Sequence, residues 1–171
     1  DMPMRKIGDI YEQLLYGDTP MGWDIAGSKD IIHALKRQDF VSYMDSLYSA
    51  DNITVSVAGG MDEKAVLADI EKYFGGMKQF STNKPQLVVE NQIKPSLLLR
   101  NKKTEQIHIA LGVRTVALEN PEKYPLAVLS SILGGGMSSR LFEEVREKRG
   151  LGYYVRSHQD EYADVGSLVS V

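Results

Sequence analysis

A polar, turn-rich stretch near the middle of the chain constrains the fold more than any other feature of the sequence. From residue 77 to residue 95 the periodic spacing of apolar residues weakens, and the stretch contains the run Ser81-Thr82-Asn83-Lys84-Pro85. Such a run is typical of a connector between two packed units, because these residues favour turns. The sequence therefore predicts one unit over residues 1–78, a connector over 79–95 and a second unit over 96–171.

The first unit is predicted to be mainly helical. Its apolar residues recur at three- and four-residue spacing, which is the pattern of amphipathic helices. Ser28 and Asp62 stand where they can cap the first turn of a helix. One segment instead alternates β-branched apolar residues with small or polar ones, as a strand with one buried face does. The predicted elements are helices over residues 3–15, 28–35, 39–48 and 62–74, and a strand over residues 52–58.

The second unit is predicted to mix strands and helices. Ile107, Ile109, Leu111 and Val113 alternate with more polar residues, which indicates one buried strand face. The predicted elements are strands over residues 97–99, 106–113, 153–158 and 165–171, and helices over residues 121–133 and 138–150. Because strands and helices do not alternate steadily, the fold class is predicted as α+β, with helices packed on mostly antiparallel sheets.

Composition and charge exclude several classes of function. A net charge of -3 with mixed signs gives no basic stripe, so nucleic acid is not expected as a partner. No apolar run approaches the roughly 18 residues that span a bilayer, so a membrane is not expected either. The chain has no cysteine, so a metal site would need His, Asp or Glu. Its apolar ending, residues 167–171, predicts a piece of a longer protein.

The residues that could carry chemistry are ambiguous when they are read by pattern alone. His33, His108 and His158 are far apart and belong to no zinc motif, so structural roles are expected. The glycine triplet of residues 134–136 could approach an anion, but it lacks the rest of a phosphate loop, and a turn between helices is the simpler interpretation. The charged run 143–149 is typical of a solvated helix face with an ion pair between residues 144 and 148.

A longer pattern emerges when residues 133–153 are taken together. This stretch, LGGGMSSRLFEEVREKRGLGY, closely resembles a signature of the insulinase/pitrilysin family of zinc metallopeptidases. The run TEQIHI at residues 104–109 is similar to the strand that opens the second half-domain of that family. Residues 1–3, 20–27, 48–59 and 73–74 resemble the end of its first half-domain, although Trp23-Asp24 departs from the basic residue that is common there.

The resemblance implies where the chemistry of the parent protein would come from. The family holds zinc with the inverted motif H-x-x-E-H and a distant glutamate, all in the first half-domain. These ligands fall upstream of the residues matched here. Residues 1–78 would be the later part of the first, zinc-type half-domain, and residues 96–171 the earlier part of the second. Zinc is therefore expected in the parent protein and at no site of this chain.

The resemblance also assigns roles to residues of this chain. Arg146 and Tyr153 match an arginine and a tyrosine that the second half-domain extends towards substrate near the zinc. A guanidinium and a phenol hydroxyl can stabilise the negative charge that develops on a peptide carbonyl oxygen. Gly134, Gly135 and Gly136 would border the cavity between the half-domains and bind substrate.

Three functions stay open at this point. The first is a fragment of a zinc-dependent endopeptidase, inactive by itself; the second is a non-catalytic partner subunit of the same family; the third is a purely structural role. Expected partners are a peptide substrate, the rest of its own polypeptide or a paired subunit, and a second copy, because open sheet edges tend to pair. A cytoplasmic bacterial location is expected, with the mitochondrial matrix as the alternative.

Overall fold

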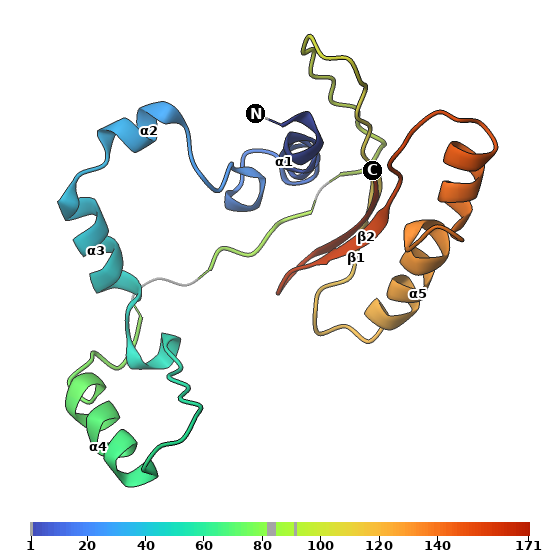
Figure 1. Cartoon of the computed structure of the whole chain (residues 1–171). Coiled ribbons are helices and arrows are strands. Elements are labelled where there is room, and N and C mark those ends of the chain that lie inside the picture. Colours follow the sequence, from blue (N-terminus) through green and yellow to red (C-terminus); the bar gives the residue numbers. More distant parts are fainter. Residues whose placement is uncertain (1, 82–84, 91) are drawn as a thin grey trace. The chain divides into compact units, whose positions relative to one another are not determined.

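The computed structural model describes residues 2–81, 85–90 and 92–171. It contains two compact units (Figure 1). In the structure the first unit is formed by residues 1–25 together with 87–171, and the second unit by residues 26–86. Parts of the predicted connector, residues 82–84 and 91, lie outside the described residues, as does the first residue. The division into half-domains at residues 78 and 96 stays a prediction.

The first unit is built on a three-stranded antiparallel sheet with strand order β1-β3-β2. Strands β1 (Leu111–Thr115) and β2 (Ser157–Glu161) both pair with β3 (Gly166–Ser170). Neighbouring residues of a strand point to opposite faces of the sheet, so Leu168 and Val169 lie on different faces. Both side chains are buried, so β3 is covered on its two faces.

Helix α1 (Pro3–Tyr16) covers the face that carries Val169, and the short turn η1 (Pro20–Gly22) follows it. Gly112 on β1 allows the close approach of the helix, because a Cβ there would overlap the hydroxyl of Tyr11. This face contains the buried apolar core, which consists of Tyr11, Leu15, Tyr16, Val165 and Val169. The predicted amphipathic helix over residues 3–15 is thus confirmed, and its apolar stripe faces the sheet.

Polar contacts fix α1 to the sheet at two further points. Arg114 of β1 donates a hydrogen bond to the carbonyl oxygen of Leu15 and forms a 2.8 Å ion pair with Glu90. At the other point, the hydroxyl of Tyr162 donates a 2.5 Å hydrogen bond to Oε1 of Glu12. Since Arg114 reaches one of the last carbonyl groups of the helix, its charge also complements the helix dipole.

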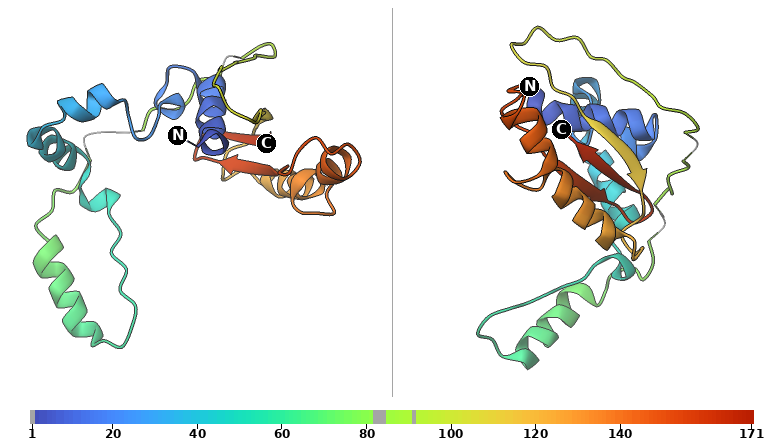
Figure 2. Two further views of the ribbon diagram at one scale, coloured as in Figure 1. Left: turned by 45° about the horizontal axis from the view of Figure 1, so that its top comes forward. Right: turned by 90° about the vertical axis from the view of Figure 1, so that its right-hand side faces the viewer.

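Helix α5 (Lys123–Gly134) covers the opposite face of the sheet (Figure 2). Its last residue, Gly134, is buried against the start of β2, where a Cβ would overlap the backbone nitrogen of Ser157. The chain then forms a wide helical turn, η3 (Phe142–Glu147), in which the N–H of Lys148 donates to the carbonyl of Glu143. The predicted helix over residues 138–150 is therefore shorter and wider than expected.

The second unit contains helices α2 (Lys29–Ala34), α3 (Arg37–Leu47) and α4 (Glu63–Phe74), with the short turn η2 (Ala50–Asn52) between α3 and α4. The predicted caps are confirmed, because Ser28 accepts from the N–H of Ile31 and Asp62 accepts from two N–H groups of α4. Asp51 accepts a 3.0 Å hydrogen bond from the N–H of Ser81. This bond joins η2 to the segment after α4.

Several predicted strands are wrong in place or extent. Residues 52–58 and 97–99 form no strand, because no partner strand pairs with them among the described residues. Two other predicted strands begin later than expected, at Leu111 instead of residue 106 and at Ser157 instead of residue 153. The fold class is nevertheless confirmed as α+β, with helices packed on an antiparallel sheet. In the described part of the chain, no helix has both the length and the apolar character that a bilayer span requires.

Two tyrosines packed on the core lead to a predicted loss of stability at high pH. Burial raises the pKa of Tyr16 from 10.0 to about 12, and burial together with the bond to Glu12 raises the pKa of Tyr162. Folding therefore favours the neutral phenols. Their contribution to the free energy of unfolding is fully present below the unfolded-state pKa of tyrosine. It is lost as the pH rises through the folded-state pKa. The free energy of unfolding should fall between about pH 10 and about pH 12.

Urea unfolding at a series of alkaline pH values measures this decline. Tyr16→Phe should make the decline shallower, because one of the shifted phenols is removed. Tyr124→Phe is the matched control, since Tyr124 is exposed, and it should follow the parent chain. Equal slopes for the parent and Tyr16→Phe would contradict the assignment.

The contact between α5 and β2 leads to a second prediction. Gly134→Ala should destabilise the chain by more than about 2 kcal/mol, because the new methyl group meets the backbone of Ser157. Gly136→Ala should change stability by less than about 0.5 kcal/mol, since a Cβ there meets no atom within 4 Å. Urea unfolding of both variants makes the comparison, and similar losses in the two would show that the close approach is not what requires glycine.

Candidate functional site

A small pocket of the first unit brings together all five residues that the sequence assigned to the site. Gly134, Gly135, Gly136, Arg146 and Tyr153 all line it. The other lining residues are Met137, Phe142, Tyr154, Val155 and Arg156. Its volume is about 200 Å³. Pockets for whole small molecules measure roughly 300–1,000 Å³, so this space suits one side chain or one chain end.

Wide turn η3 carries Arg146, which lines this pocket. Lys148 lies 2.7 Å from Glu144 and 3.0 Å from Glu143, so these two carboxylates are engaged elsewhere. Hydrogen bonds from Lys148 and then Arg149 lower the pKa of Glu144 to about 2. The ion pair predicted between residues 144 and 148 is therefore confirmed. Among the described residues no carboxylate pairs with Arg146, whose guanidinium carbon lies 4.7 Å from the centre of the Phe142 ring.

Tyr153 lies in the segment between η3 and β2. Its side chain is 86% exposed, so the hydroxyl is available to a bound molecule. Gly150, with φ of +60°, ends the preceding helical segment in a backbone conformation that glycine adopts most readily. The chain can therefore turn sharply after η3 and run back along the pocket to β2.

The three glycines differ in what their missing side chains permit. Gly134 is buried against β2, so its role in packing accounts for the absence of a side chain. Gly136 is exposed and has open space around it, so a bound molecule can approach its backbone. The glycine triplet thus combines a packing contact at one end with an accessible wall of the pocket at the other.

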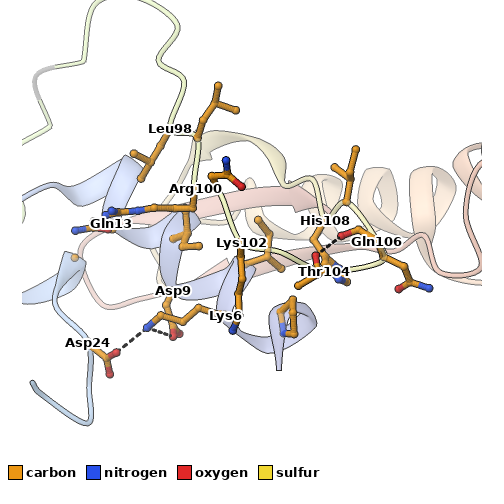
Figure 3. A pocket seen from close by; sticks show the side chains of 17 residues that line it. Lys6, Asp9, Gln13, Asp24, Leu98, Arg100, Lys102, Thr104, Gln106 and His108 are labelled. Atoms are coloured by element: carbon orange, nitrogen blue, oxygen red, sulfur yellow. Dashed lines mark hydrogen bonds and ion pairs between the residues drawn. The ribbon is translucent and has the colours of Figure 1, made fainter. Parts of the chain in front are cut away.

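A larger pocket of about 880 Å³ lies between α1 and residues 98–108 (Figure 3). Three of its charged groups engage one another, because Lys6 bonds to Asp9 at 2.9 Å and to Asp24 at 2.7 Å. Arg100 donates a 3.1 Å hydrogen bond to Gln13. None of the five predicted site residues lines this pocket. The smaller pocket is therefore the better candidate for the site.

The described residues do not provide a donor set for zinc. No group of three or more His, Cys, Asp or Glu side chains comes together in that part of the chain. His158 lies near Asp160, with 3.6 Å between Nε2 and Oδ1. His108 lines the larger pocket, and His33 lies on α2. The described residues therefore do not fit a zinc ion.

Sequence reasoning missed Arg156, which also lines the small pocket. Its backbone N–H donates to the carbonyl of Val171 at 2.9 Å and its carbonyl accepts from Val171 at 2.8 Å. Its guanidinium carbon lies 5.5 Å from the centre of the Tyr154 ring. No spacing rule singles out an arginine just before a strand, and only the fold brings its backbone to the same pocket as Arg146.

Comparison with known proteins identifies the family. Residues 34–169 match the family described as the peptidase M16 inactive domain. The chain is 34% identical over 172 residues to a Bacillus subtilis protein named uncharacterized zinc protease YmxG, covering 98% of this chain and 40% of that protein. A Mycobacterium leprae protein, also named as an uncharacterized zinc protease, is 36% identical over 171 residues, with 98% and 38% covered. The chain thus spans about two fifths of the length of these relatives.

A solved structure agrees with this result at the level of the fold. The crystal structure of a peptidase M16 inactive domain from Pseudomonas fluorescens matches with a TM-score of 0.75 and 20% identity, covering 98% of this chain and 41% of that one. The resemblance to a zinc metallopeptidase family, first inferred from residues 133–153, is confirmed by these matches. The chain belongs to the peptidase M16 family, in the part described as its inactive domain.

Proposed function

We propose that this chain is part of a zinc-dependent endopeptidase and provides contacts to the substrate and the transition state. The observation that supports this most directly is the convergence of the five site residues on one pocket, where Arg146 has no carboxylate partner among the described residues. The names of the relatives, which are called zinc proteases, support zinc in the family. The zinc ligands would come from residues outside this chain.

The chemistry proposed for this pocket is electrostatic. Attack on a peptide carbonyl places negative charge on its oxygen, and donors that are already in place stabilise that charge. Arg146 offers several N–H donors in a rigid fork, and Tyr153 offers one O–H donor. The backbone at Gly136 can lie beside an extended peptide, because no side chain stands in the way. Zinc, held elsewhere in the protein, would supply Lewis acidity when it is bound.

A non-catalytic partner subunit of the same family is the alternative, and in that case Arg146 and Tyr153 would act on a substrate held by another chain. We also propose that the parent protein resembles insulinase, pitrilysin or processing peptidases, and that it is located in the cytoplasm. The relatives named above are bacterial proteins. Pairing with a second copy is proposed from the sheet, in which β1 and β2 each have one neighbouring strand among the described residues.

Metal analysis of the full-length protein that carries this chain tests the proposed activity. It should contain about one zinc ion per polypeptide and hydrolyse unstructured peptides, and a chelator should abolish hydrolysis until zinc is restored. A protein without zinc that becomes active only when a second chain is added would support the partner-subunit alternative. Absence of both zinc and hydrolysis, alone or with the partner, would refute the peptidase function.

Substitution of Arg146 tests the role of the pocket. Arg146→Ala in the full-length protein should lower kcat/KM by on the order of a hundredfold, because a transition-state donor is lost. The melting temperature should stay close to that of the parent, since this side chain is exposed and makes no ion pair among the described residues.

Arg149→Ala is the matched control for this experiment. Arg149 belongs to the same charged run, but it pairs with Glu144 and does not line the pocket. Its removal should change kcat/KM by less than about threefold. Equal activity of Arg146→Ala and the parent would rule out the proposed role, and equal losses in the two variants would indicate a general effect of charge.

A further inference from the structure

One face of turn η3 borders the small pocket. Within residues 141–149, all of which the structure describes, Phe142 and Arg146 line the pocket and the others do not. Residues four apart on a helix are neighbours on the same face. A wall formed by the backbone of the turn would include residues 143–145 as well. The side chains of Phe142 and Arg146 therefore face the pocket.

The guanidinium of Arg146 contacts an aromatic ring in place of a carboxylate. Its central carbon lies 4.7 Å from the centre of the Phe142 ring, within the roughly 6 Å over which the face of a ring attracts a cation. The two acidic residues that follow Phe142, Glu143 and Glu144, are both paired with Lys148. These carboxylates therefore have a partner of their own, and the ring supplies the attraction for Arg146.

Contact with a ring suits an arginine that has to bind a substrate. Phe142 is partly buried and Arg146 is exposed, so the ring offers a fixed surface to a long side chain. The ring attracts the positive charge through its face and leaves the N–H donors, which lie in the guanidinium plane, for other partners. A guanidinium held in this way loses less conformational entropy when it binds a substrate than a freely moving one does.

We infer that Phe142 is a positioning residue, whose ring holds the Arg146 guanidinium in the pocket where it meets the substrate carbonyl oxygen. Phe142 acts through Arg146 and needs no contact with the substrate. The inference rests on the proposed peptidase function and adds a residue to it. Because ring and cation contacts at exposed sites are weak, the ring should contribute about fivefold to kcat/KM, less than Arg146 itself.

Substitutions that keep or remove the aromatic face test this role in the full-length protein. Phe142→Leu keeps an apolar side chain without a ring, and it should lower kcat/KM for an unstructured fluorogenic peptide by about fivefold. Phe142→Tyr keeps the ring and should stay within about twofold of the parent. Equal losses in the two variants, or no loss in Phe142→Leu, would overturn the inference.

Tyr124→Leu is the matched control for this comparison. Tyr124 on α5 has the same kind of contact, with Nζ of Lys123 lying 5.3 Å from the centre of its ring, but it does not line the small pocket. Its loss should leave kcat/KM at the value of the parent. A loss as large as that of Phe142→Leu would show that the effect is not specific to the pocket and would also count against the inference.

A double-mutant cycle determines whether the ring acts through Arg146. In the Arg146→Ala background, Phe142→Leu should cause almost no further loss of kcat/KM, because the guanidinium that the ring positions is already absent. A loss as large as in the parent background would mean that the ring serves the pocket independently of Arg146, and the positioning role would be wrong.

Fluorination of the ring separates its charge distribution from its shape. Each added fluorine weakens the negative potential on the ring face, while the size of the ring changes little. With phenylalanine analogues of increasing fluorine content at position 142, log kcat/KM should fall stepwise in the parent and stay level in the Arg146→Ala background. Level values in both backgrounds would indicate packing alone and refute the role. These analogues keep the test valid even if Phe142→Leu does not fold.

A readout that needs no catalysis separates this inference from the peptidase function. In NMR spectra of the full-length protein with labelled arginine, the ring current of Phe142 should shift the δ-methylene protons of Arg146 upfield, and Phe142→Leu should abolish the shift. If the shift is present and no peptide is cleaved, the peptidase function fails while the positioning contact stands. If peptides are cleaved and the shift is absent, the positioning role is refuted while the peptidase function stands.

Discussion

The close contact between the end of α5 and the start of β2 is the constraint on which the candidate site depends. Gly134 has no side chain, so the helix end lies directly against the backbone of Ser157. This contact brings the glycine triplet beside the segment that carries Tyr153, Tyr154 and Arg156. Because β3 pairs with β2 and is covered on both faces, the wall formed by this segment rests on the best-packed part of the unit.

The sequence predicted helices better than strands, and the physical reason is locality. The helix over residues 3–15 and the caps at Ser28 and Asp62 depend on contacts within a few residues, and the structure confirms all three. A strand needs a partner elsewhere in the chain, and the segments 52–58 and 97–99 have the right alternation without a described partner. Alternation alone does not reveal whether such a partner exists.

The candidate site was predictable only in part, for a similar reason. Pattern reading of residues 143–149 gave a solvated helix face, and the ion pairs of Lys148 and Arg149 agree with it. The same ion pairs leave Arg146 without a carboxylate partner among the described residues, which no count of charges along the run could reveal, because it depends on the wide turn of η3. The family resemblance supplied Arg146 and Tyr153. It supplied nothing on Arg156, whose position follows from the pairing of its backbone with Val171.

The described residues of the second unit are almost all exposed, so this unit should open locally more readily than the first. Of its described residues only Ser49 is buried, and Phe40, Tyr43 and Leu67 are exposed on its helices. Segments with so few buried apolar contacts open at little cost in free energy, so their amide hydrogens exchange with solvent far sooner than those of β3. Any surface that these helices dock on must offset the entropy of ordering them. Protection from hydrogen exchange in α2, α3 and α4 would therefore report association more sensitively than it reports folding of the first unit.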